Sequence, residues 1–96
     1  MNNVIKTAQA LDDWDMMPDQ KSIKRVFRFK DFKQAWEFMS LCADYAEKIN
    51  HHPEWLNVYS RVDVTLTTHD QGGLSVLDVK MAEHMNAIAG QLQTQK

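Results

Sequence analysis

The sequence of 96 residues has little of what marks a disordered, disulfide-linked or membrane-spanning chain. Only three glycines and two prolines occur among 44% hydrophobic residues, which excludes a low-complexity or disordered segment. The single cysteine, Cys42, excludes an internal disulfide and a zinc site made of four cysteines. No long apolar run is present, and residues 1–15 soon turn acidic, so we expect neither a signal peptide nor a membrane span.

An excess of one charge is also missing. Eleven basic and thirteen acidic residues give a net charge of -2. Nucleic-acid-binding proteins normally carry a basic excess that neutralises phosphates, so we expect no nucleic-acid partner and no membrane partner. No repeat or linker divides the chain. The sequence therefore predicts one small cytoplasmic domain over residues 1–96, with a core of limited size.

The first half of the sequence predicts a helix, a strand and a second helix. Apolar residues at three- and four-residue steps indicate a short helix that ends before Trp14, and residues 16–20 indicate a turn. Alternation over residues 23–29 predicts a strand with an aromatic face. Asp31 is placed to cap a helix that extends to Ile49. Its predicted buried face consists of Ala35, Trp36, Met39, Cys42, Ala43, Ala46 and Ile49.

A second apolar stripe on this helix consists of Phe38, Leu41 and Tyr45. A wide core face and a subunit interface both account for three large apolar side chains beside the first stripe. A small domain with a thin core gains stability from either arrangement.

The second half predicts two strands and a helix. Pro53 disfavours helical backbone at His52, so the preceding helix ends there. Two strands meet near residues 60–61, and Ser75 with Asp78 forms a capping box that opens the last helix. Its predicted buried face is Leu77, Met81, Ala82, Met85, Ile88, Ala89 and Leu92. This order of elements, without a βαβ unit, predicts an α+β fold with an antiparallel sheet.

Three of the four histidines lie at the ends of predicted elements. His51 and His52 follow a helix, and His69 follows a strand. Imidazole titrates near pH 6.5, so three such groups in one cleft suit a reaction that moves two protons. Structural roles also account for each: a cation at a helix end, a packed turn residue and a solvent-exposed strand end.

The remaining candidates have simpler explanations. The capping box accounts for Asp78 without any function, although capping and substrate contact are compatible. We expect His84 on the surface without a partner and Cys42 as inert packing. Trp14 and Trp55 are expected in the core, and either can also line a flat aromatic pocket.

Two other chemistries compete with acid–base catalysis. Three histidines can hold a catalytic zinc, but two of these are neighbours and no His-x-His or His-x-x-x-His pair occurs among them. Nucleophilic catalysis by Cys42 or a serine lacks the spacing or elbow motif that it requires. The sequence therefore favours proton transfer without a metal.

Residues 47–55 (EKINHHPEW), followed by NVY at 57–59, resemble the pterin-4a-carbinolamine dehydratase family. The resemblance continues through VDVTLTTH at 62–69, GLS at 73–75 and Asp78, and upstream through Trp14 and FKDF at 29–32. It implies a four-stranded antiparallel sheet with about three helices on one face, and a homodimer or homotetramer formed through sheet edges and helix faces. The family dehydrates 4a-hydroxytetrahydropterin, the spent cofactor of aromatic amino acid hydroxylases, to quinonoid dihydropterin, with no cofactor or metal of its own.

The resemblance also implies roles for single residues. His51, His52 and His69 match the functional histidines, and Asp78, Trp14 and Thr68 form the expected substrate-binding set. We assign His52 to the leaving hydroxyl, with His51 and His69 binding the substrate or exchanging the other proton. The resemblance implies an aromatic amino acid hydroxylase as the functional partner. Two alternatives stay open: a non-catalytic interaction module, since some animal relatives bind a dimeric homeodomain activator, and action on another pterin, linked to molybdopterin metabolism.

Overall fold

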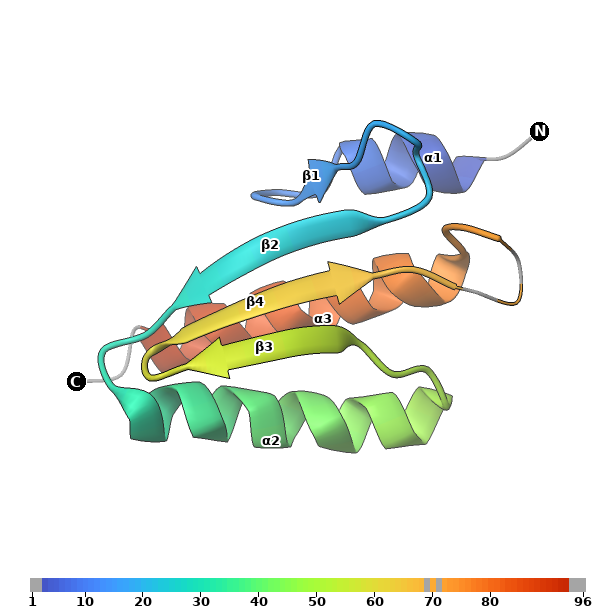
Figure 1. The fold of residues 1–96 in the computed structure, drawn as a ribbon. Coiled ribbons are helices and arrows are strands. Elements are labelled where there is room, and N and C mark those ends of the chain that lie inside the picture. The colour runs from blue at the N-terminus through green and yellow to red at the C-terminus, as the bar shows by residue number, and fades with distance from the viewer. Residues whose placement is uncertain (1–2, 69, 71, 94–96) are drawn as a thin grey trace.

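The computed structural model of the chain describes residues 3–68, 70 and 72–93. Its elements, labelled in Figure 1, are α1 (Asn3–Gln9), β1 (Asp15–Met16), β2 (Ile23–Arg28), α2 (Phe32–Ile49), β3 (Glu54–Val58), β4 (Arg61–Leu66) and α3 (Val76–Gln93). Among these described residues, no helix combines the length and the apolar character needed to cross a membrane.

The four strands form one antiparallel sheet in the order β1-β2-β4-β3. The β2–β4 pairing is the longest, running from Ile23 opposite Leu66 to Arg28 opposite Arg61. The prediction of a turn over residues 16–20 is wrong at Met16, which pairs with Ile23 as part of β1. Two residues are too few to show the alternation of a strand. This edge strand is therefore identified by its pairing with β2.

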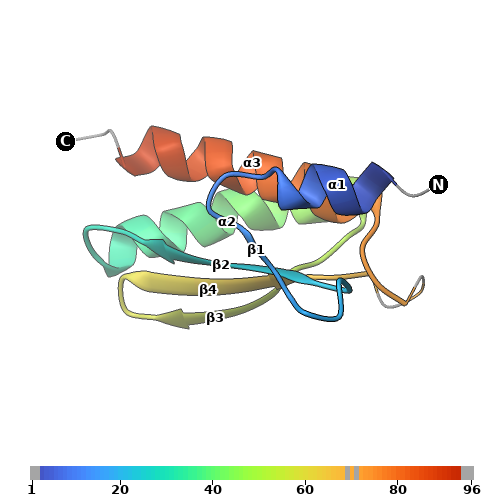
Figure 2. The ribbon, with the colours of Figure 1, turned by 90° about the horizontal axis from the view of Figure 1, so that it is seen from above.

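Figure 2 shows the three helices on one face of the sheet and the other face uncovered. The alternation along β4 explains this: Val62, Val64 and Leu66 are buried, while the residues between them are partly exposed. Side chains at every second position of a strand share a face, so one face of β4 is apolar and packs on the helices. The predicted α+β fold, with helices on one face, is confirmed.

The core is aromatic where β2 meets α2. The ring of Phe38 lies 4.7 Å from that of Phe27 and 4.9 Å from that of Phe29, measured between centroids. Phe38 is fully buried, so this member of the second apolar stripe of α2 belongs to the core. Leu41 is exposed and Tyr45 is partly buried. The stripe is therefore divided between core and surface.

The predicted buried face of α2 is wrong at two positions. Trp36 is 57% exposed, and its ring stacks on that of Phe32, while Ala43 is also exposed. The buried residues are Gln34, Ala35, Phe38, Cys42 and Ala46. Two apolar stripes lie side by side on this helix, and periodicity alone could not tell which one faces the sheet. The fit of Phe38 between Phe27 and Phe29 decides it.

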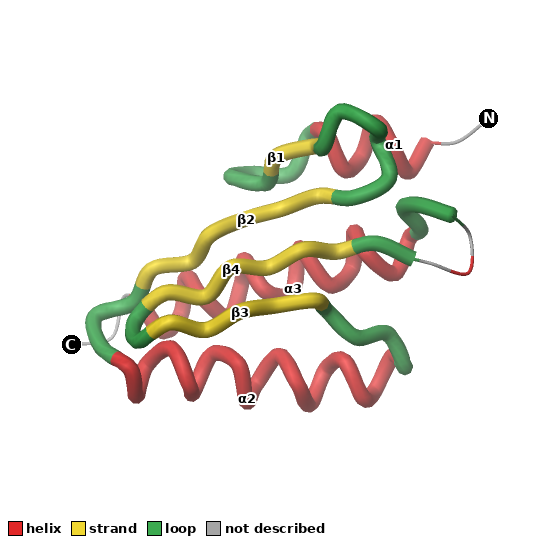
Figure 3. Tube along the Cα trace, in the orientation of Figure 1, coloured by secondary structure: helices red, strands yellow, loops and turns green. Residues whose placement is uncertain are grey.

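Both ends of α2 are capped by local contacts. The Asp31 carboxylate accepts a hydrogen bond from the Gln34 amide, as its predicted capping role requires. At the other end Asn50 adopts a left-handed conformation with φ of 54°, which stops the helix. The loop at 50–53 then lies at the same end of the molecule as the start of α3 and the segment after β4, as Figures 1 and 3 show.

Candidate functional site

The buried centre of the candidate site is a histidine–carboxylate pair between the end of α2 and the start of α3. His51 Nε2 lies 2.6 Å from Asp78 Oδ1. The side chain of His51 is 11% exposed and that of Asp78 is fully buried. A buried carboxylate is stable only when hydrogen-bond donors replace the water it has lost. Asp78 must therefore be held by several groups.

The partners of Asp78 come from the segment between β4 and α3. Its Oδ2 accepts hydrogen bonds from the Ser75 amide at 2.9 Å and from the Thr68 hydroxyl at 2.7 Å. The Ser75 hydroxyl lies 2.7 Å from Thr68 Oγ1 and accepts from the Leu77 amide at 3.2 Å. The predicted capping box is confirmed. The same contacts aim the other oxygen of Asp78 at His51, so capping and site geometry coexist.

His52 occupies a different environment from its neighbour. Its Nε2 lies 2.6 Å from Glu47 Oε2, and the two side chains are 58% and 78% exposed. The predicted alternative of a packed turn residue does not fit this exposure. Sequence reasoning missed Glu47 as a partner. A carboxylate in the last turn of α2, five residues before a histidine just past that helix, is the signal that could have found it.

Thr68 closes the segment after β4. Its amide and carbonyl pair with the carbonyl and amide of Gly73. Its hydroxyl faces Asp78, whereas Thr67, one residue earlier, donates from its hydroxyl to the Lys21 carbonyl. Successive residues of an extended chain point to opposite faces, so the two threonines serve opposite sides of the sheet. His69 lies outside the described residues.

Trp14 is part of the core, 5% exposed, with its indole Nε1 donating to Asn86 Oδ1 at 2.8 Å. The guanidinium of Arg25 donates to the same oxygen and lies over the Phe27 ring. Burial lowers the pKa of Arg25, and the nearby Asp13 carboxylate opposes that shift. Asn86 therefore connects Trp14 and Arg25 to α3. No sequence pattern indicated this role. Trp55 is partly buried and packs against the core.

His84 is not the isolated surface residue that the sequence predicted. Its ring stacks on Tyr45 with centroids 3.8 Å apart and planes 12° apart. Burial and the nearby Lys48 ammonium lower the pKa of His84. The contact joins α2 to α3, and sequence patterns could not indicate it because the two residues lie on different helices. His84 is therefore a packing residue between helices.

Cys42 is the other titratable group in the core. It is fully buried, and burial raises the pKa of its thiol to about 12. A thiol that stays protonated at neutral pH is a poor nucleophile, as the sequence predicted for this position. Among residues 3–68, 70 and 72–93, no three His, Cys, Asp or Glu side chains gather as metal ligands. The alternative of a three-histidine site includes His69 and so falls partly outside these residues.

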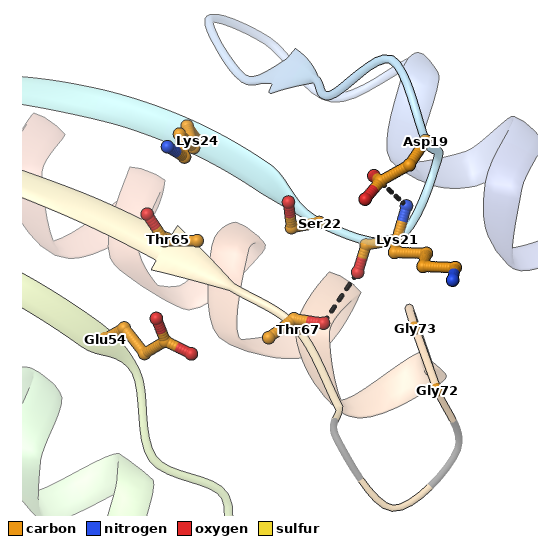
Figure 4. Close-up of a pocket in the computed structure, with 9 residues that line it drawn as sticks. All are labelled: Asp19, Lys21, Ser22, Lys24, Glu54, Thr65, Thr67, Gly72 and Gly73. Atoms are coloured by element: carbon orange, nitrogen blue, oxygen red, sulfur yellow. Dashed lines mark hydrogen bonds between the residues drawn. The ribbon is translucent and has the colours of Figure 1, made fainter.

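A pocket of about 490 Å³ lies on the uncovered face of the sheet, near the end of β4. Figure 4 shows Lys24 and Ser22 from the β2 side, Thr65 and Thr67 from the β4 side, and Glu54 facing the same space. The described lining does not include His51, His52 or Asp78. Thr67 borders this pocket and Thr68 contacts Asp78. The pocket and the pair of His51 and Asp78 therefore lie on opposite sides of the segment after β4.

The fold is an α+β fold in which one layer of helices covers a four-stranded antiparallel sheet. A buried histidine–carboxylate pair lies at one end of it. The sequence model of a family described as pterin 4 alpha carbinolamine dehydratase matches residues 2–88. The chain belongs to this family.

Named relatives and solved structures agree with this assignment. The chain is 53% identical over 90 residues to proteins of Brucella ovis and Brucella canis that carry the provisional name pterin-4-alpha-carbinolamine dehydratase; the match covers 94% of this chain and 90% of each relative. A Brucella melitensis structure titled transcriptional coactivator/pterin dehydratase is 54% identical, with a TM-score of 0.84 over 88% of this chain and 90% of that one. A pterin dehydratase-like RuBisCO assembly factor shares the fold, with a TM-score of 0.70 at 20% identity over 81% of this chain and 90% of that chain.

Proposed function

We propose that this protein dehydrates a 4a-hydroxytetrahydropterin to the quinonoid dihydropterin and water, and so recycles the pterin of an aromatic amino acid hydroxylase. Family membership supports the reaction class. The observation that carries the proposal is the pair of adjacent imidazoles at one end of the fold, each with its own carboxylate: His51 with buried Asp78, and His52 with exposed Glu47.

The reaction needs two proton transfers and no change in redox state. The bond from C4a to the hydroxyl oxygen breaks, and the hydroxyl gains a proton as it leaves as water. A ring nitrogen of the pterin loses a proton, and its electrons form the new double bond. A protonated imidazole at the hydroxyl and a neutral imidazole at the ring nitrogen supply both transfers, each contributing about 10²–10⁴-fold.

The two histidines divide these roles. His52, which is more than half exposed, stands where a leaving water can reach solvent, so we assign it as the acid. His51 is held rigidly by Asp78, which suits a base that must meet a ring nitrogen in a fixed direction. His69 completes the proposed set of catalytic residues. Asp78, Thr68 and Trp14 are proposed to shape the pterin site, Asp78 through its contact with His51.

The test follows the ultraviolet absorbance of freshly made 4a-hydroxytetrahydropterin as it decays with and without the protein. We expect acceleration by the wild-type chain and none by a folded His51→Ala/His52→Ala double variant. A His84→Gln variant is the matched control, since that histidine packs between helices. A folded wild-type protein that accelerates neither biopterin nor simpler pterin substrates contradicts the proposal.

A second candidate function is a non-catalytic interaction module. The outer side of α2 favours it, because Phe32 and Trp36 stack on each other and are 45% and 57% exposed. Large exposed apolar groups often mark a protein-binding surface. Binding of a protein partner that survives the His51→Ala/His52→Ala change and is lost in Trp36→Ser would separate this function from catalysis.

We also propose that the chain forms a homodimer or homotetramer. The exposed apolar residues of α2 and the outer edge of β3 support self-association, since β3 is the last strand of the sheet order. Sedimentation analysis of the wild type and of Trp36→Ser measures the assembly. A wild-type monomer at micromolar concentration contradicts the proposal.

A further inference from the structure

Four groups, from the segment after β4 and from the start of α3, form a chain of hydrogen bonds that ends at His51. The distances are 3.2 Å from the Leu77 amide to Ser75 Oγ, 2.7 Å from Ser75 Oγ to Thr68 Oγ1, 2.7 Å from Thr68 Oγ1 to Asp78 Oδ2, and 2.6 Å from Asp78 Oδ1 to His51 Nε2. Each distance is short enough for a hydrogen bond. The number of protons that each group can donate then determines which group is the donor in each bond.

The direction is fixed at the Leu77 end. A backbone amide can only donate, so the Ser75 oxygen accepts from it and keeps its own proton for another partner. The Thr68 hydroxyl has one proton, which it donates to Asp78 Oδ2. Ser75 must then donate to Thr68 in the contact between the two hydroxyls. All protons in the chain point toward Asp78.

Asp78 is therefore an acceptor on both of its oxygens. Its Oδ2 accepts from Thr68 and from the Ser75 amide, and its Oδ1 faces His51. Each of its oxygens faces a group that can donate, and a carboxylate offers only lone pairs. The proton in the contact with His51 therefore lies on Nε2.

We propose that Ser75 and Thr68 are positioning residues that act through Asp78 to fix neutral His51 as the Nε2–H tautomer. The lone pair of His51 then lies on Nδ1, which is the atom that accepts a proton in the reaction. This inference rests on the proposed function for the identity of the reaction, but the tautomer itself is a property of the free protein. Holding an imidazole in one tautomer through a buried carboxylate is an established means of setting up a base.

The arrangement makes a sharp prediction for Asp78→Asn. The Ser75 amide and the Thr68 hydroxyl both donate toward the position of Oδ2, so the new side chain must place its carbonyl oxygen there. Its NH₂ group then faces His51 and donates to Nε2. His51 is forced to carry its proton on Nδ1, and the base is lost although the shape of the site is kept.

The experiment is ¹⁵N NMR of the 96-residue chain, labelled at its histidines, above about pH 8, where an ordinary imidazole is neutral. His51→Gln identifies the His51 signals by their absence. We expect a protonated Nε2 and an unprotonated Nδ1 in the wild type, and the reverse in Asp78→Asn. A wild-type His51 protonated on Nδ1 overturns the proposal, and this measurement needs no variant of the chain to fold other than the one used for assignment.

The contribution of Thr68 is tested by a matched pair of variants. Thr68→Ser keeps the hydroxyl and should keep the Nε2–H tautomer, whereas Thr68→Val removes a donor from Asp78 and should increase the share of Nδ1–H. We expect kcat to fall at least about tenfold in Thr68→Val and to recover in Thr68→Ser, because correct base protonation contributes about 10²-fold or more. Identical spectra for the two variants overturn the role of Thr68.

The outcomes for the two proposals are distinct. The expected tautomer in a protein that accelerates no pterin dehydration supports the hydrogen-bond chain and rejects the proposed function. Dehydratase activity with His51 protonated on Nδ1 has the opposite meaning, because the reaction then proceeds without the positioning that Ser75 and Thr68 are proposed to supply.

Discussion

His51 and His52 are neighbours in the chain but differ in burial and in the carboxylate that each contacts. The ring of His51 is nearly buried and bonds to a carboxylate that water does not reach. The ring of His52 is more than half exposed and bonds to a carboxylate on the surface. The left-handed turn at Asn50 directs the chain out of α2 just before both residues. Adjacent identical residues therefore acquire different surroundings from the partners that the fold brings to them.

The largest expected effect is on activity when the buried member is removed. His51→Ala should lower kcat/KM for 4a-hydroxytetrahydropterin about 10²–10⁴-fold, because the substrate loses its oriented base. The spontaneous reaction without protein sets the baseline of the absorbance assay. Activity within twofold of the wild type in a folded His51→Ala protein would place the base elsewhere.

The variants His51→Ala and His52→Ala should differ in their free energy of unfolding. His51→Ala leaves the Asp78 carboxylate buried without one of its partners, so we expect a loss of about 1–3 kcal/mol. His52→Ala removes only an exposed pair and should cost less than about 1 kcal/mol. Urea unfolding followed by circular dichroism measures both. Equal losses would mean that burial does not distinguish the two histidines.

The exposed member should still matter for turnover. His52→Ala is expected to lower kcat at least about tenfold while the fold is kept, because the leaving hydroxyl loses its proton donor. A pH profile of kcat then checks the assignment. The decrease in kcat at high pH, where a general acid has lost its proton, should disappear when the imidazole is removed. Near-wild-type kinetics in the folded variant remove His52 from the mechanism.

A smaller effect is expected when the surface partner is neutralised. Glu47→Gln should change kcat by less than about fivefold, because an exposed ion pair is worth about 0–1 kcal/mol. The matched variant is Asp78→Asn, which makes the same carboxylate-to-amide change in the buried pair. Similar losses from the two variants would show that the two carboxylates act alike.

The smallest effect concerns His84, whose partner is a ring in place of a carboxylate. Burial and Lys48 lower the pKa of His84, so the unfolded chain binds this proton more readily than the folded chain. The resulting stability is present above pH about 6.5 and is lost as the pH falls through the folded pKa. The free energy of unfolding should therefore drop less between pH 7.5 and pH 5.5 in His84→Gln than in the wild type. An equal drop contradicts this account.

The fold could be predicted in large part because its signals are local. The alternation along β2 and β4, the Asp31 cap and the Ser75–Asp78 capping box each depend on residues a few positions apart. The errors lie where partners are distant. The burial of Phe38 in place of Trp36 depends on rings from β2, and the stacking of His84 depends on Tyr45 from another helix.

The site shows the same division. The available groups can be identified from the sequence alone: two adjacent histidines after a helix that proline ends, and an aspartate inside a capping box. The meeting of Asp78 with His51 spans 27 residues and depends on how α2 and α3 pack, whereas His52 and Glu47 are only five residues apart at the end of one helix. The physical reason is that the donors which surround a buried carboxylate come from segments brought together by packing. Spacing along the chain fixes the side chains of one turn, but it does not fix the meeting of two ends of different helices.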